Sequence, residues 1–115
     1  MPLSRDFVET VKKQANHSKA FRLGMLKDAA SAFMTGEPGT GRDVLRDYVK
    51  ATIGFEELAR RLDMTSSSLK RMLGPKGNPS SNNLASIMGV LQDHEGVTLC
   101  VVTERQAEPR KFETA

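Results

Sequence analysis

The chain has 115 residues, which is the length of one compact domain and excludes a second full one. Hydrophobic residues make up 38% of it, but there is no tryptophan, one tyrosine and five phenylalanines. The core must therefore consist mainly of aliphatic side chains, which favours helices over an all-β fold. Seventeen Lys and Arg against fourteen Asp and Glu leave a net charge of +3, which permits a polyanionic partner without identifying one.

The N-terminal third shows helical periodicity, because apolar residues recur every three to four positions. Two amphipathic helices are predicted there. The first carries Leu3, Phe7, Val11 and Ala15, and the second carries Leu23, Leu26, Ala30 and Phe33. Ser18 is the expected N-cap of the second helix. We expect residues 1–53 as a whole to form a helical region that packs on a core formed by residues 54–93.

Residues 36–41 contain three glycines and a proline and are expected to turn the chain between two helices. A third helix follows, in which Thr40 and Asp43 have the spacing of a capping box and Gly54 marks the end. Its expected buried residues are Val44, Leu45, Tyr48 and Val49.

The same glycine-rich segment resembles the phosphate-binding loop of ATPases, but it lacks the groups that do the chemistry. Arg42 and Asp43 stand where that motif has a phosphate-binding lysine and a Mg²⁺-coordinating hydroxyl. Residues 29–35 before it have the pattern of a helix end instead of a buried strand. We therefore expect no nucleotide binding.

Residues 55–72 have the spacing of a helix-turn-helix. Ala59 is small at the expected helix crossing, and Asp63 stands at the tight turn, where a positive φ is common and Asp tolerates it. The alternative is a plain helical hairpin. The first short helix carries Phe55, Leu58, Ala59 and Leu62, and the second opens at Thr65 and carries Leu69, Met72 and Leu73.

Charge placement favours the DNA-binding interpretation, because residues 64–92 include no acidic residue. The second helix begins with several hydroxyls and with the positive end of its dipole. Both can bind phosphates and base edges. The candidate DNA-binding residues are Thr65, Ser66, Ser67, Ser68, Lys70, Arg71 and Lys76. Among them Ser66, Ser67 and Lys70 are expected to contact bases and Lys76 to hold phosphate, while Arg71 suits either task.

The two arginines of the preceding helix, Arg60 and Arg61, have two possible roles. They either touch the flanking DNA backbone or are neutralised by Glu56 and Glu57, one turn earlier.

Residues 74–79 are rich in glycine and proline and are expected to interrupt the helix. A sixth helix follows, which Ser80 can cap. Its expected inward-facing residues are Leu84, Ile87, Met88 and Leu91. Residues 97–103 then change to the alternation of a strand, within an expected dimerisation segment at 96–103. A lone strand needs a partner, so the same strand of a second subunit is expected to pair with it through Val97, Leu99 and Val101. The tail at residues 104–115 is polar and expected to be disordered.

Residues 53–91, about a third of the chain, resemble the antidote proteins of bacterial addiction modules. The similarity is to HigA-type antitoxins, whose helix-turn-helix is of the phage-repressor kind. It lies in residues 53–59, in residues 68–79 and in Leu84 and Leu91, and the Gly77-Asn78-Pro79 turn is its most specific part. The resemblance implies a DNA-binding regulator and, for an antitoxin, a small toxin partner.

Together these patterns predict a mainly all-α protein of about six helices and one C-terminal strand, with a helix-turn-helix core at residues 54–93. The expected function is that of a soluble, cytoplasmic, homodimeric and sequence-specific DNA-binding transcriptional regulator. The alternative is an antitoxin that masks a toxin through residues 97–102 or its N-terminal helices, with little DNA binding of its own.

An enzyme is not expected, nor is a metal or cofactor. Cys100 is expected to be a buried thiol, and His17 and His94 to be separate surface residues. The only cysteine and two histidines supply too few ligands for a typical zinc site.

Overall fold

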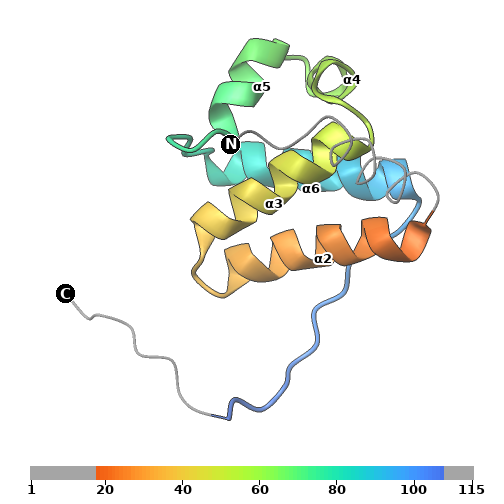
Figure 1. Cartoon of the computed structure of the whole chain (residues 1–115), viewed down its shortest axis with the longest axis vertical. Helices are drawn as coiled ribbons and strands as arrows, with labels where there is room; N and C mark the ends of the chain where they lie inside the picture. The colour runs from red at the N-terminus through yellow and green to blue at the C-terminus, as the bar shows by residue number, and fades with distance from the viewer. Residues whose placement is uncertain (1–17, 108–115) are drawn as a thin grey trace, which may run out of the picture.

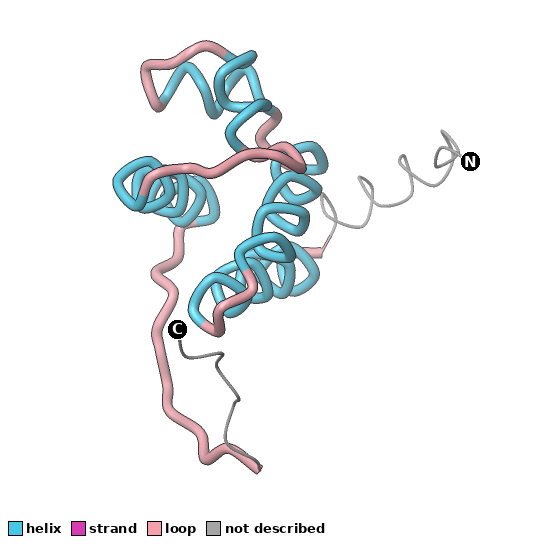
Figure 2. Tube along the Cα trace, turned by 90° about the vertical axis from the view of Figure 1, so that its left-hand side faces the viewer, coloured by secondary structure: helices cyan, strands magenta, loops and turns pink. Residues whose placement is uncertain are grey.

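The computed structural model describes residues 18–107, and within them it contains five α-helices and no strand (Figures 1 and 2). The helices are α2 (Lys19–Met34), α3 (Pro38–Ala51), α4 (Phe55–Arg61), α5 (Ser66–Met72) and α6 (Ser81–Glu95). The mainly all-α class is thus confirmed. The first expected helix, at residues 3–15, lies outside the described residues. None of the described helices is long and apolar enough to cross a membrane.

The helices α2 and α3 form an antiparallel hairpin along one side of the molecule (Figure 1). Ser18 caps α2 as predicted, because its hydroxyl accepts a 3.1 Å hydrogen bond from the Phe21 N–H. The hairpin buries Leu26 and Ala29 from one helix and Leu45 from the other.

The predicted start of α3 is wrong. The helix begins at Pro38, so Thr40 lies inside it and forms no capping box with Asp43. Proline suits the first helical position, because its fixed φ is helical and its missing N–H has no partner there in any case. Gly41 lies within the helix. A Cβ at this position would come within 2.8 Å of the Phe33 ring. The absence of a side chain lets α2 and α3 approach closely.

The short helices α4 and α5 lie at one end of the molecule, and α4 also packs against α3 and α6. All five helices contribute to one apolar cluster. Its members are Leu26, Ala29, Leu45, Tyr48, Val49, Phe55, Leu58, Ala59, Leu69, Leu73, Ile87 and Leu91. Ser80 caps α6 as predicted, with a 3.1 Å hydrogen bond from the Asn83 N–H.

A buried polar cluster ties α2, α3 and α6 together. The Glu95 side chain is only 3% exposed, and its carboxylate accepts hydrogen bonds from Arg22 Nε at 3.0 and 3.1 Å. The Tyr48 hydroxyl donates a further bond of 2.5 Å to the same carboxylate. Burial, reinforced by the Glu95 carboxylate, raises the pKa of Tyr48 above its usual range. The charge of Glu95 is thus compensated inside the protein.

Residues 97–103 do not form the expected strand, since no other strand within residues 18–107 is available to pair with them. They leave α6 and run past the hairpin without helix or strand (Figure 2). Leu99 packs against the core, and its N–H donates a 2.7 Å hydrogen bond to Gln92 Oε1. Cys100 is exposed, which corrects the prediction of a buried thiol, because it follows Leu99 on the side away from the core.

Candidate nucleic-acid interface

The turn between α4 and α5 has the geometry that the sequence predicted. Asp63 adopts a φ of +55°, the only positive φ outside glycine among the described residues. The Met64 N–H donates a 3.0 Å hydrogen bond to the Ala59 carbonyl and closes the turn. Ala59 is 2% exposed, so there is little room for a larger side chain where α4 packs.

Thr65 caps α5 and uses part of the hydroxyl cluster predicted to bind DNA. Its Oγ1 accepts a 3.1 Å hydrogen bond from the Ser68 N–H and donates one of 2.9 Å to the Ser68 hydroxyl. Two of the four hydroxyls therefore stabilise the helix start, while Ser67 is exposed and Ser66 half-buried. Among the four hydroxyls, that of Ser67 is therefore the most accessible to a bound ligand.

The inner face of α5 is fixed to the rest of the domain. Leu69 and Leu73 are fully buried, and Arg46 of α3 donates a 2.9 Å hydrogen bond from Nη1 to the Leu73 carbonyl. A cation at a helix C-terminus also interacts favourably with the helix dipole. The orientation of α5 is thus set by α3 as well as by α4.

The outer face of α5 and the following loop carry the predicted basic residues. Lys70 and Arg71 on the helix and Lys76 in the loop are exposed. Gly77 allows this loop to fold back on α5, because a Cβ there would come within 2.0 Å of the Met72 carbonyl oxygen. The glycine therefore brings Lys76 beside the end of α5.

An open hollow of about 350 Å³ lies between the end of α5, this loop and the start of α6. Its lining contains two cations and no carboxylate. The lining residues are Ser68, Arg71, Met72, Lys76, Gly77, Asn78, Pro79, Ser80 and Asn83. The structure thus brings together Ser68, Arg71 and Lys76, while Ser67 and Lys70 do not line the hollow. A hollow with cations, amides and hydroxyls suits an anionic group such as a phosphate.

No family model, curated protein or solved structure matches this chain.

The structure shows one of the two roles expected of the α4 arginines, the neutralisation by a carboxylate. Glu57 accepts hydrogen bonds from Nε of Arg60 and from Nε of Arg61, both at 2.9 Å. Hydrogen bonds from Arg60 and then Arg61 lower the pKa of Glu57 to about 2. Glu57, and not Glu56, is the neutralising carboxylate among the described contacts.

The segment that resembled a phosphate-binding loop contributes no such loop, since residues 38–41 form the first turn of α3. Among residues 18–107, no group of three or more His, Cys, Asp or Glu side chains is arranged to hold a metal ion. His94 is exposed as predicted, and His17 lies outside the described residues.

Two residues that make long-range contacts were not predicted from the sequence. Arg46 gave no signal, because its partner is a backbone carbonyl far along the chain. Glu95 did give a signal in the sequence, because it is the last residue of α6, where the helix dipole disfavours an acidic side chain. Such a residue is a candidate for a partner elsewhere in the fold.

Proposed function

We propose that the protein is a sequence-specific DNA-binding regulator of transcription, similar to an antitoxin. The observation that carries the proposal is the acid-free surface of α5 and the following loop. It exposes Lys70, Arg71 and Lys76 on a short helix whose opposite face is buried. Residues 64–92 contribute no carboxylate that would repel a duplex, and an α-helix fits the major groove.

Three local features support a helix-turn-helix. The tight turn at Asp63, the cap at Thr65 and the anchored Leu69 keep α5 at a fixed angle to α4. A plain helical hairpin requires neither the acid-free face nor a glycine that folds a basic loop onto the helix. Both features favour a DNA-binding role.

The direct test is a fluorescence-anisotropy titration of labelled duplexes with the purified protein. We expect binding to the DNA upstream of its own reading frame that is at least about a thousand times tighter than to a random duplex. Equal affinity for both duplexes would exclude specific recognition of that site. No binding to either duplex at low salt would exclude the proposed function.

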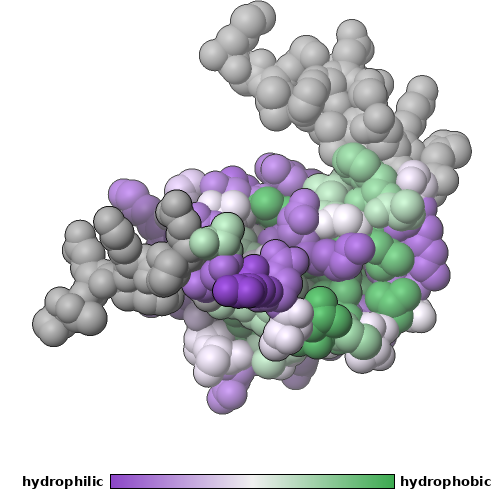
Figure 3. Space-filling view, turned by 90° about the horizontal axis from the view of Figure 1, so that it is seen from below, coloured by the Kyte–Doolittle hydropathy of each residue, from purple (hydrophilic) through white to green (hydrophobic). Residues whose placement is uncertain are grey.

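We further propose that the regulator is a homodimer in which residues 97–103 pair with the same segment of a second copy. Val101 is 71% exposed and Val102 84%, although both are large apolar side chains. Seen from the side opposite α4 and α5, apolar surface gathers toward one side of the molecule (Figure 3). A second strand would satisfy the backbone groups of this segment and cover Val101.

The same exposed apolar segment supports a second candidate function, that of an antitoxin that masks a small toxin. A toxin strand would satisfy the same backbone groups as a second copy of the chain. Co-expression with the product of the neighbouring reading frame, followed by gel filtration, separates the two. A stable mixed complex whose DNA affinity is negligible would support the masking role.

A further inference from the structure

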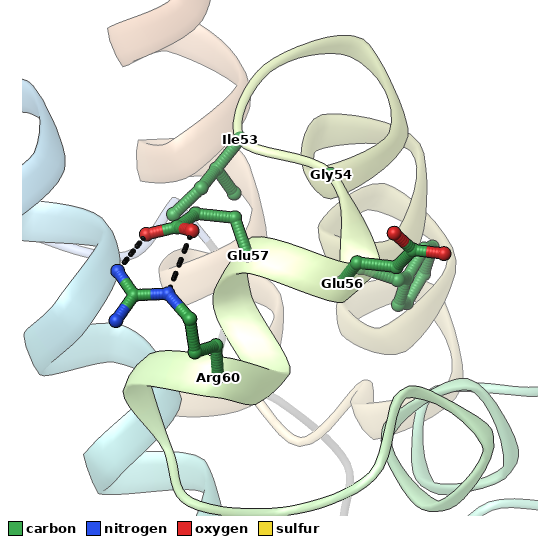
Figure 4. Close-up of a pocket in the computed structure, with 6 residues that line it drawn as sticks. Ile53, Gly54, Glu56, Glu57 and Arg60 are labelled. Carbon is green, nitrogen blue, oxygen red and sulfur yellow. Dashed lines mark hydrogen bonds and ion pairs between the residues drawn. The ribbon is translucent and has the colours of Figure 1, made fainter.

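The arginines Arg60 and Arg61 share a single carboxylate on the exposed surface of α4. Arg60 binds Glu57 with both Nε and Nη2, and Arg61 binds it with Nε. Figure 4 shows the Arg60 guanidinium paired with the Glu57 carboxylate, beside Ile53. Two positive charges thus face one negative charge, and half of the cationic charge is compensated.

This cluster is accessible to a ligand. The Arg60 side chain is 71% exposed, and Glu57 and Arg60 line an open hollow of about 560 Å³. Exposed ion pairs contribute little to stability and are screened by salt. A guanidinium carries five N–H donors, so each arginine keeps donors that the carboxylate does not use. A phosphate can therefore compete with Glu57 for the same cations.

The position of α4 makes this competition relevant to the proposed function, on which the inference rests. As the first helix of the helix-turn-helix, α4 packs directly against α5. In such motifs this helix crosses the DNA backbone while the second helix lies in the groove. Contacts from its arginines to phosphates strengthen binding to every sequence equally, because phosphates carry no sequence information.

We propose that Glu57 limits the strength of DNA binding by competing with DNA phosphates for Arg60 and Arg61. By holding both guanidiniums it weakens the sequence-independent part of binding. The contacts of α5 with base edges are left unchanged. Because phosphate contacts add equally to the binding of every sequence, the affinity for specific and random duplexes is lowered alike and their ratio is unchanged.

The test compares Glu57→Gln with Glu56→Gln. Both remove one negative charge from the same turn of α4, but within the described residues only Glu57 holds the arginines. Affinity for a labelled duplex of random sequence is measured by anisotropy between about 0.05 and 0.3 M salt. We expect Glu57→Gln to steepen the log–log salt dependence by about one to two units and to raise affinity roughly tenfold per freed arginine at the lowest salt.

The control Glu56→Gln should change the salt slope by much less than one unit. Adding Arg60→Ala and Arg61→Ala to Glu57→Gln should return affinity to the wild-type value or below. Circular dichroism at each salt concentration verifies that the variants are folded.

Equal effects of the two glutamine variants, or no effect of either, would overturn the role of Glu57 and leave the proposed function intact. Failure of the wild type and of Glu57→Gln to bind any duplex would instead overturn the proposed function, and the role of Glu57 with it. Binding of the random duplex by Glu57→Gln alone, with the wild type binding only its specific duplex, would support the inference most strongly.

Discussion

The Tyr48 hydroxyl donates a 2.5 Å hydrogen bond to the carboxylate of Glu95, a residue 47 positions later in the chain. Tyr48 is fully buried and Glu95 is 7% exposed. Because a buried carboxylate is costly unless it is paired, this bond and the one from Arg22 decide whether the end of α6 stays packed on the hairpin.

Tyr48→Phe should destabilise the fold by about 1.5–3 kcal/mol, because it removes a hydrogen bond to a charged acceptor. Urea denaturation followed by circular dichroism measures the change. The same substitution made in a Glu95→Gln background should cost less, since the acceptor is then neutral. Equal losses in both backgrounds would mean that the hydroxyl acts through packing alone.

The pKa of Tyr48 predicts a decline in stability in alkaline solution. Burial and Glu95 raise this pKa in the folded state above the ordinary value of 10.0. The folded protein therefore holds the phenol proton more tightly than the unfolded chain. The resulting contribution to the free energy of unfolding is fully present below pH 10. Above that pH stability should fall by up to about 1.4 kcal/mol per pH unit. Tyr48→Phe should lose this part of the decline, and an unchanged slope would contradict the assignment.

Gly77→Ala should destabilise the loop after α5 by about 1–3 kcal/mol, because the new Cβ would overlap the Met72 carbonyl. Gly89→Ala is the matched control: it lies in α6, where a Cβ meets nothing within 4 Å. It should stabilise the protein by up to about 1 kcal/mol through helix propensity. Thermal unfolding of both variants checks the pair, and a neutral Gly77→Ala would show that the loop does not need its close approach.

Lys76→Ala and Lys70→Ala should affect DNA binding in different ways. Lys76 lies in the loop beside the hollow, so its loss should weaken binding to all duplexes and lower the salt slope by about one unit. Lys70 is exposed on α5, and its loss should reduce the preference for the specific site by roughly 1–3 kcal/mol. If Lys70→Ala weakened binding to every sequence equally, its role in reading bases would have to be abandoned.

Val101→Lys should convert the proposed dimer to a monomer, as measured by light scattering at tens of micromolar protein. Val102→Lys is the control on the opposite face of the expected strand and should leave the mass unchanged. These exposed positions are preferable to Leu99, which packs against the core. A monomeric wild type at this concentration would refute the dimer.

Local features were predictable because they depend on a few neighbouring residues. Ser18, Thr65 and Ser80 are caps as their sequence context indicates, and Asp63 takes the positive φ expected of the turn. The start of α3 was missed because glycine usually interrupts helices, whereas Gly41 here serves the packing of Phe33.

Features that join distant parts of the chain could not be read from local patterns. The alternation at residues 97–103 is that of a strand, but a strand forms only where another strand supplies hydrogen-bond partners. Arg46 and Glu95 act on residues 27 and 73 positions away, through contacts that only the folded chain creates. The residues of the candidate DNA surface lie close together because they are contiguous in sequence, which local patterns reveal. The long-range contacts of Arg46 and Glu95 are not visible in such patterns.

The connection between Arg22 and Glu95 has a consequence for how the molecule folds. The hairpin of α2 and α3 and the pair α4 and α5 bring together segments adjacent in sequence, and such local pairs form quickly. The Arg22–Glu95 contact spans 73 residues, so closing it costs more loop entropy than either pair. We therefore expect the Arg22–Glu95 contact to form late in folding and to break early in unfolding. Its loss should then shorten the lifetime of the native state more than it slows folding.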